Sequence, residues 1–318
     1  MDPTRIKLND MNSSQDNICF QAEKHDLVQT DAFKTAEEFC QFLMHRKAYE
    51  VAAGLANGKV VLDFGCNIGY GTNIISNACG KIAGVDVSSK AIEQARRRYS
   101  SDKTEFRVID GSSLPFSDGC FDMIVSFQVV EHLYNYDSYF AEIKRVLKSD
   151  GLVLFTTPNA LIRLEPGMKP WNEFHVREFA PVEFEKILRT YFPAVSIRGL
   201  FAKEPVYSIE FNRVQSMLNR SKKRTSPFAW LRKKIGLFLP DPALEVLRNM
   251  VRQFMYFKGS GVAVARTGSS GFAYSVNDYY YLDKAAENID QALDLMAACR
   301  IDGKKIEMRS DNECLERP

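Results

Sequence analysis

The fold is decided by residues 59–72, which read Lys-Val-Val-Leu-Asp-Phe-Gly-Cys-Asn-Ile-Gly-Tyr-Gly-Thr. Residues 60–62 form an apolar run without a polar interruption, as expected of a strand that is buried on both faces. The residues that follow favour a sharp turn, because glycine has no Cβ and asparagine tolerates positive φ: Gly65, Asn67, Gly69 and Gly71. Residues 72–78 read as the start of a helix. Strand, glycine turn and helix together predict a binding corner of the nucleotide type.

The order of the glycines distinguishes between classes of nucleotide site. A dinucleotide fold requires G-x-G-x-x-G, and a phosphate loop requires a lysine after its last glycine. Here the order is Asp63-x-Gly65-x-Asn67-x-Gly69, and no lysine follows the last glycine. This pattern resembles motif I of the class I S-adenosylmethionine-dependent methyltransferases, D/E-x-G-x-G-x-G, with Asn67 in place of the middle glycine. A ligand of the methionine type carries no phosphate, so a cationic side chain is not required.

The composition is that of an ordinary globular protein. The 318 residues are 45% hydrophobic and 26% charged, and the net charge of +2 argues against a nucleic-acid footprint over the whole surface. The seven cysteines include no C-x-x-C pair and are interpreted as reduced thiols, not as a disulfide or zinc framework. The N-terminus has no apolar signal region, and no apolar run is long enough to span a bilayer. We therefore expect a cytoplasmic protein that binds no nucleic acid.

The predicted core is preceded by a polar segment, residues 1–34, and by one or two amphipathic helices within residues 35–56. His45 and Tyr49 lie one helical turn apart and are candidates to reach over the cofactor pocket. The alternative is a helix packed on the edge of the sheet, with Tyr49 half-buried.

An acid ends the second predicted strand, residues 81–86. Asp86 follows the glycine corner by about twenty residues, where folds of this kind place a carboxylate on the ribose hydroxyls. The alternative is an N-cap or a surface acid. Ser88 or Ser89 is expected to cap the next helix, residues 90–99.

The third predicted strand, residues 104–109, leads into an acidic turn. In the methyltransferase family the acid of this turn meets the adenine amino group, so the resemblance places Asp110 and the backbone of Gly111 there. The full set of cofactor contacts that the resemblance implies is Asp63, Gly65, Cys66, Asn67, Gly69, Asp86, Val87, Asp110, Gly111, Ser112 and Gln128.

A second series of motifs matches the same family: Leu-Pro-Phe at 114–116, a fourth strand at 121–127, and Glu131-His132. A helix over 136–147 and a fifth strand over 152–157 follow. The stretches T-P-N at 157–159 and N-x-F-H-V-R-E-F at 172–179 resemble the branch often found beside polysaccharide and lipopolysaccharide biosynthesis enzymes, in which this loop overhangs the substrate end of the sheet. Residues 181–190 are predicted to be a helix, and 194–200 the sixth strand.

Residues 201–291 extend beyond the minimal family domain. Cations and apolar residues are interleaved over 220–238, which favours either an amphipathic contact with an anionic membrane or lipid-linked glycan, or a cover that packs on the core. An acid-rich helix over 285–295 is expected to lead into the last strand, so that residues 292–318 form that strand and a polar tail.

Methyl transfer to a hydroxyl benefits from a general base, and His is the usual choice near neutral pH. His132, at the carboxyl end of the fourth strand, and His175, on the overhanging loop, are the candidates. The alternative for His132 is a structural hydrogen bond to a neighbouring helix. Carboxylates show no convincing metal-ligand spacing, so no metal is expected.

We therefore predict an α/β, Rossmann-like, doubly wound sheet of seven strands, the last antiparallel, with N-terminal helices, a core over 35–200 and a cover insertion over 201–291. The predicted function is transfer of a methyl group from S-adenosyl-L-methionine to a sugar or glycan hydroxyl. Other small-molecule acceptors, phenolic or quinone-like, are an alternative, as is a non-catalytic S-adenosylmethionine-binding partner subunit. A nicotinamide oxidoreductase is disfavoured because the glycine order does not suit a pyrophosphate.

Overall fold

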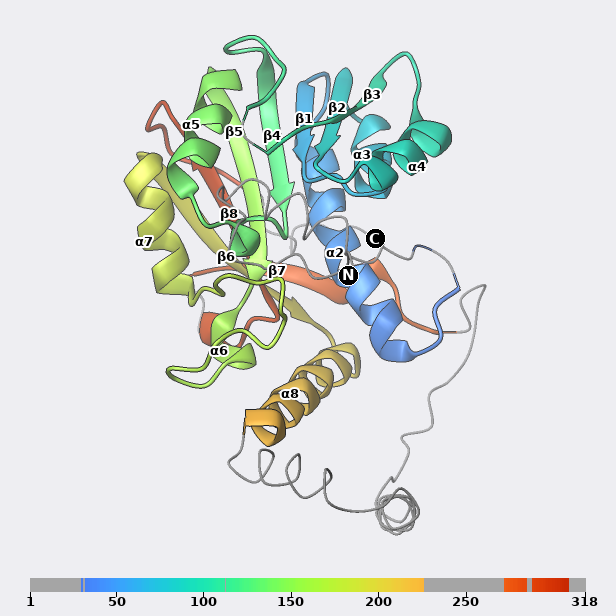
Figure 1. Cartoon of the computed structure of the whole chain (residues 1–318), viewed down its shortest axis with the longest axis vertical. Coiled ribbons are helices and arrows are strands. Elements are labelled where there is room, and N and C mark those ends of the chain that lie inside the picture. Colours follow the sequence, from blue (N-terminus) through green and yellow to red (C-terminus); the bar gives the residue numbers. More distant parts are fainter. Residues whose placement is uncertain (1–29, 31, 112, 226–271, 285–287, 309–318) are drawn as a thin grey trace, which may run out of the picture.

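Figure 1 shows the computed structural model, which describes residues 30, 32–111, 113–225, 272–284 and 288–308, except for the side chains of 222–225. These residues form an eight-stranded sheet of order β3-β2-β1-β4-β5-β8-β6-β7, with helices on both faces. The strands are β1 (Val60–Phe64), β2 (Lys81–Asp86), β3 (Thr104–Val108), β4 (Phe121–Phe127), β5 (Leu147–Pro158), β6 (Ala194–Ala202), β7 (Tyr279–Asp283) and β8 (Asp294–Arg300).

The two faces of the sheet carry separate hydrophobic cores. Val61 packs with one set of helices and Leu62 with the other, because neighbouring residues of a strand point to opposite faces. The first set comprises α2 (Ala36–Leu55) and α3 (Tyr70–Ser76), with α4 (Ser89–Tyr99) beside α3. The second comprises α5 (Tyr136–Val146) and α7 (Pro181–Tyr191). The prediction of a doubly wound fold is confirmed.

The topology also confirms that the last strand runs antiparallel. Strands β1 to β5 pair in parallel, whereas β8 inserts antiparallel between β5 and β6. The sheet has one strand more than predicted, because β7 pairs antiparallel with the outer edge of β6. The helix expected over 285–295 is wrong for the described residues 288–295, where a 3-10 turn at Ile289–Gln291 leads directly into β8. Alanine and leucine suit either structure, and pairing on both sides of β8 decides for the strand.

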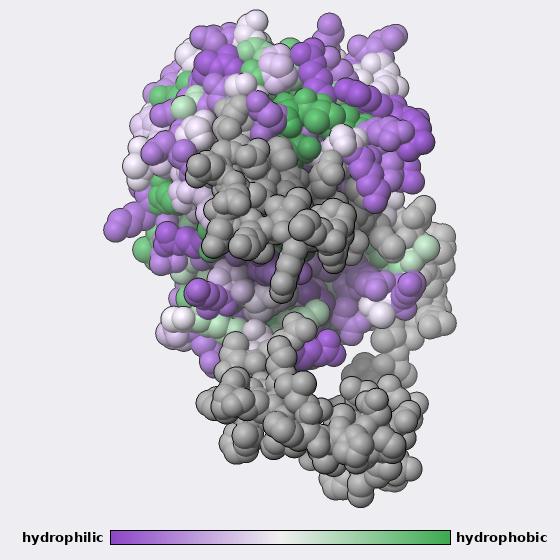
Figure 2. Space-filling model, viewed as in Figure 1, coloured by the Kyte–Doolittle hydropathy of each residue, from purple (hydrophilic) through white to green (hydrophobic). Residues whose placement is uncertain are grey.

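The described part of the 201–291 insertion packs on the core. Helix α8 (Val206–Thr225) buries Val206, Val214 and Leu218, and it lies against α2 and α6 (Ala160–Arg163). Most of the cationic stretch 220–238 lies outside the described side chains. Among the described helices, none has the length and apolar character needed to cross a bilayer. The face seen in Figure 2 is largely hydrophilic, with apolar side chains gathered toward the β1–β3 side of the sheet.

Close packing explains the glycine at position 71. Helix α2 is a single helix, and its Tyr49 ring lies directly over the start of α3. A Cβ on Gly71 would lie 2.1 Å from this ring. The ring is held by edge-to-face contacts with Tyr70 and Phe127, so it has no room to retreat.

Gly71→Ala is therefore expected to lower the free energy of unfolding by about 1–3 kcal/mol through overpacking. The matched control is Gly54→Ala in α2, where a Cβ meets nothing within 4 Å. That change is expected to raise the free energy of unfolding by about 0.5–1 kcal/mol. Urea unfolding of both variants measures these two changes in the free energy of unfolding. Equal effects of the two substitutions would contradict the packing described for Tyr49.

Candidate active site

The glycine corner joins β1 to α3 in a backbone conformation that the sequence predicts. Gly65 (φ 90°), Asn67 (φ 46°) and Gly69 (φ 76°) all have positive φ. The left-handed conformation expected of Asn67 is thus confirmed. The amides of Gly65 and Cys66 donate to the Val85 carbonyl at 2.8 and 3.0 Å, which fixes the turn against the end of β2. The Cys66 thiol is buried, so only the backbone of Cys66 faces a ligand at the corner.

Asp63 lies beneath the corner. Its carboxylate is fully buried and accepts a hydrogen bond from the Thr72 hydroxyl at 2.6 Å, with the Tyr49 hydroxyl at 3.5 Å. Burial raises the pKa of Asp63 to about 7, although the hydrogen bond from Thr72 acts to lower it. This carboxylate braces the corner, and its contact with a cofactor stays a prediction.

The structure favours the packed alternative for the helix that carries His45 and Tyr49. The Tyr49 side chain is buried, and its ring packs on Tyr70 and Phe127. Burial, with the charges of Arg213 and Arg163, lowers the pKa of His45 to about 4. Neutral His45 is therefore the form present near neutral pH.

Asp86 stands at the end of β2, beside the corner. Its Oδ2 accepts from the Asn67 amide at 2.8 Å and its Oδ1 from the Ser88 amide at 2.9 Å. Ser88, the residue that caps α4, is buried, whereas Asp86 and Val87 are half-buried and border the corner. Asp86 therefore lies beside the corner, and its contact with the ribose stays a prediction.

The acidic turn after β3 borders a shallow pocket on the same side of the sheet. Gly111 has φ 79°, and the Ser113 amide donates to Asp110 Oδ1 at 3.3 Å. Gly111 lines the pocket together with Phe64 and Leu114. Ser112 lies outside the described residues. The contact of Asp110 and Gly111 with the adenine ring stays a prediction.

The corner fits a cofactor such as S-adenosylmethionine. A Cβ on Gly65 or Gly69 would collide with Val129 or Phe106, so the packing of the protein itself requires glycine at both positions. The half-buried Asp86 carboxylate suits a diol, and no lysine or arginine is required for a ligand without phosphate.

A polar group closes the carboxyl end of β4. Gln128 has φ 57°, and its side-chain amide donates to Asp294 Oδ2 at 2.9 Å and to Thr156 Oγ1 at 3.2 Å. Burial raises the pKa of Asp294, which opens β8. Gln128 is therefore engaged by protein groups, and its contact with the cofactor stays a prediction.

The predicted catalytic histidines lie together. His132 belongs to the short 3-10 helix η2 (Val130–His132), and His175 to the loop before α7; their rings meet edge to face with centroids 4.8 Å apart. Burial lowers the pKa of His132, partly offset by the hydrogen bond of its Nδ1 to the Phe174 carbonyl at 2.9 Å. His132 Nδ1 is therefore bonded to the loop that carries His175.

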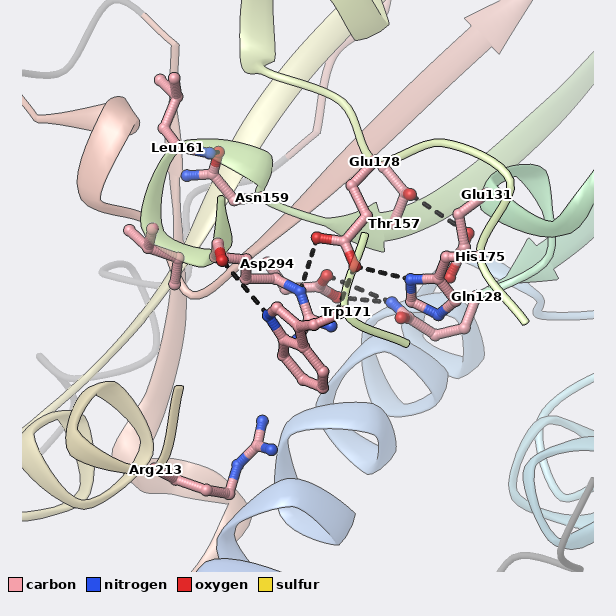
Figure 3. A network of polar contacts seen from close by, with 12 residues as sticks. Gln128, Glu131, Thr157, Asn159, Leu161, Trp171, His175, Glu178, Arg213 and Asp294 are labelled. Atoms are coloured by element: carbon pink, nitrogen blue, oxygen red, sulfur yellow. Dashed lines mark hydrogen bonds and ion pairs between the residues drawn. The ribbon is translucent and has the colours of Figure 1, made fainter. Parts of the chain in front are cut away.

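A buried ion pair holds the second histidine (Figure 3). His175 Nδ1 lies 2.7 Å from Glu178 Oε1, and Arg163 donates to both oxygens of Glu178 at 2.8 and 3.0 Å. These hydrogen bonds keep the pKa of Glu178 low, although its burial acts in the opposite direction. The Trp171 ring covers the Arg163 guanidinium at 4.1 Å.

Glu131 lies between the histidines and β5. Thr157 Oγ1 donates to its Oε2 at 3.1 Å, and burial raises the pKa of Glu131 to about 7, with the charge of His175 opposing. Sequence analysis placed Glu131 and Glu178 in family motifs without assigning them to a site, and missed Arg163 and Asp294. Their partners are distant along the chain, so no local spacing signals them. A pocket lined by Lys59, Asp122 and Arg300 among others lies at the opposite edge of the sheet.

Comparison with known proteins agrees with this geometry. Residues 62–155 match a family model described as a methyltransferase domain. A probable S-adenosylmethionine-dependent methyltransferase of Mycolicibacterium smegmatis is 35% identical over 156 residues, which cover 49% of this chain and 60% of that protein. The probable S-adenosylmethionine-dependent methyltransferase Rv3030 of Mycobacterium tuberculosis is 34% identical over 162 residues, covering 50% of this chain and 58% of that protein.

The chain therefore spans less than two thirds of the length of these curated relatives. Among solved structures, a SAM-dependent methyltransferase from Aquifex aeolicus is 18% identical with a TM-score of 0.40, over 53% of this chain and 93% of that one.

The raised pKa of Asp63 predicts how stability changes with pH. Because the folded pKa of about 7 lies above the ordinary 3.8, the folded state binds this proton more tightly between these values. The stabilisation is present at low pH and is lost as the pH rises through about 7. Asp63→Asn is expected to reduce the loss of stability between about pH 5 and 7 by roughly 2 kcal/mol, measured by urea unfolding.

The control for this comparison is Asp102→Asn, since Asp102 is an exposed acid of the turn before β3. It is expected to follow the wild-type pH dependence. If Asp63→Asn also follows the wild type, the proton is not held by Asp63.

Proposed function

We propose that this chain, whose residues 62–155 match a methyltransferase domain, uses S-adenosylmethionine to methylate a hydroxyl group of a polar acceptor, a sugar or glycan intermediate. The observation that carries the proposal is the polar character of the carboxyl end of β4 and β5. The polar side chains that lie there are Gln128, Glu131, Thr157, His175, Glu178 and Asp294 (Figure 3).

The cofactor supplies a methyl group on a sulfonium, which an acceptor oxygen can attack. The chain's own task is to align the partners, because positioning removes much of the barrier. The backbone at Gly65 and Gly69 would lie against the cofactor, and the Asp86 carboxylate would accept hydrogen bonds from its ribose hydroxyls. The turn at Asp110 and Gly111 would border the adenine ring.

Two imidazoles at the acceptor end are suited to receive the hydroxyl proton. The Phe174 carbonyl can only accept a hydrogen bond, so the His132 proton sits on Nδ1. The Glu178 carboxylate likewise holds the His175 proton on Nδ1. With the proton on Nδ1, the lone pair of each ring is on Nε2, the nitrogen that can accept the hydroxyl proton. Each ring is fixed in orientation before the acceptor arrives, which general base catalysis requires.

The polar acceptor end disfavours the phenolic or quinone-like alternative, which calls for an apolar, aromatic-lined pocket. The Trp171 ring is half-buried over the buried Arg163 guanidinium and offers a flat face that a sugar ring can contact. A non-catalytic binding subunit would need neither the oriented histidines nor this polar cluster.

Asp86→Asn is expected to weaken S-adenosylmethionine binding at least about tenfold, because a charged acceptor of two hydroxyl groups is lost. Calorimetry of the variant beside the wild type measures the change. Asp102→Asn, an exposed acid at the opposite end of the neighbouring strand β3, serves as the control with unchanged affinity. An unaltered affinity of Asp86→Asn would remove the ribose assignment.

The reaction itself is tested by following labelled methyl transfer from S-adenosylmethionine to nucleotide sugars, oligosaccharides and, for contrast, hydroquinones. We expect transfer to a sugar hydroxyl, and we expect His175→Asn to lower kcat by about 10²-fold or more with a smaller effect on cofactor affinity. His45→Asn is the control, since His45 lies on α2 outside the histidine pair. Transfer to hydroquinones alone would overturn the acceptor class, and binding without any transfer would favour the non-catalytic subunit.

A further inference from the structure

Three side chains of metal-ligating type converge at the acceptor end of the sheet. Glu131 and His132 come from η2, directly after β4, and His175 comes from the loop before α7. One potential ligand atom of each lies within 4.8 Å of the other two. Figure 3 shows Glu131 and His175 approaching each other from these separate elements.

One atom in the group has no partner among the residues that the structure describes. Glu131 is fully buried, and its Oε1 makes no hydrogen bond within this part of the chain, whereas its Oε2 is held by Thr157. An unsatisfied polar atom at this depth costs about 1–3 kcal/mol, and more when it is charged. Buried polar groups are nearly always paired, so an orphaned carboxylate oxygen beside two imidazoles indicates a missing partner.

Both imidazoles have the support that metal-bound histidines usually have. A metal-ligating histidine donates its second ring N–H to a carbonyl or a carboxylate, which fixes the tautomer and the ring orientation. His132 Nδ1 lies 2.9 Å from the Phe174 carbonyl, and His175 Nδ1 lies 2.7 Å from Glu178 Oε1. The same logic applies to the carboxylate, since Thr157 orients Glu131 from behind.

The loop that brings His175 is fastened to the turn that carries the other two groups. The amides of Val176 and Arg177 donate to the Glu131 carbonyl at 2.8 and 3.2 Å. The convergence of the three side chains is therefore built into the backbone. It does not depend on flexible side chains meeting at a surface.

We propose that Glu131, His132 and His175 bind a divalent transition-metal ion, through one carboxylate oxygen and Nε2 of each imidazole. Two imidazoles and one carboxylate suit Zn²⁺, Fe²⁺ or Co²⁺, whereas Mg²⁺ and Ca²⁺ prefer oxygen ligands. Three protein ligands leave a coordination position open, as in catalytic metal sites. The sequence expectation of no metal fails to anticipate this group, because His175 lies far from Glu131 along the chain.

A role of the open coordination position in activating the acceptor hydroxyl rests on the proposed function. A hydroxyl oxygen bound to such a cation loses its proton more readily. In the metal-loaded protein both Nε2 atoms are ligands, so the proton of the bound hydroxyl passes to solvent water; in the metal-free protein an imidazole takes it. Metal binding by the three residues stands without this step, because it requires neither the cofactor nor an acceptor.

The test is a titration of chelator-treated, full-length protein with Co²⁺, followed by visible absorption, and with Zn²⁺ by calorimetry. We expect one tight site per chain in the absence of S-adenosylmethionine. His175→Asn and Glu131→Gln are expected to weaken binding at least about 100-fold. His45→Asn is the matched control and is expected to bind as the wild type does.

Equal binding by wild type, His175→Asn and Glu131→Gln would overturn the site, as would the absence of a tight site in the wild type. Circular dichroism checks that each variant folds. Should either variant fail to fold, Thr157→Val removes only the hydrogen bond behind Glu131, and we expect it to weaken binding about 10-fold or more. Unchanged binding in Thr157→Val would then count against the site.

Methyl transfer is assayed separately with and without metal, so that the two proposals fail independently. Metal binding at these residues without any transfer leaves the site standing and removes the proposed function. Transfer that is undiminished in chelator-treated protein removes the role of the ion in acceptor activation.

Discussion

The Asp86 carboxylate holds together the part of the molecule on which the site depends. It accepts the Asn67 amide with one oxygen and the Ser88 amide with the other, so one side chain joins the glycine corner to the start of α4. Asn67 has positive φ and needs such a fixed partner. The corner, the end of β2 and the cap of α4 are thereby set relative to one another, and they face the same space at the carboxyl edge of the sheet.

At the acceptor end, which is the carboxyl end of β4 and β5, the buried charged side chains are paired with one another. Glu178 is buried with Arg163, its bidentate partner, and also meets His175. Breaking such a pair by removing one member typically costs about 3–5 kcal/mol, so the loop that carries these groups is ordered by the same contacts that shape the site. Glu131 is the exception, because one of its buried oxygens has no partner among the described residues. A binding function at that point accounts for the exception.

Much of the nucleotide side is predictable from the sequence because it depends on local patterns. The run at 60–62, the glycines after it and the acid at the end of the next strand each occupy a short stretch, so period and spacing predict them. The conformation of Asn67 and the cap at Ser88 follow from the same local chemistry.

The rest depends on contacts that spacing does not encode. Strand β7 is recognisable only through its pairing with β6, and β8 was mistaken in part for a helix because its residues suit both structures. At the site, Asp294 meets Gln128 across most of the chain's length, and Glu178 meets Arg163 and His175 only when the loop folds back. Tertiary structure brings these partners together, so single-sequence reasoning finds the residue types without their arrangement.

The central claim is that the corner between β1 and α3 binds an S-adenosyl ligand. The most direct measurement is a calorimetric titration of the wild-type protein with S-adenosylmethionine, S-adenosylhomocysteine and NAD. The account predicts saturable binding of both sulfur compounds, with a dissociation constant in the range of about a micromolar, and no binding of NAD. Binding of NAD in preference to either sulfur ligand, or binding of none of the three, would contradict it.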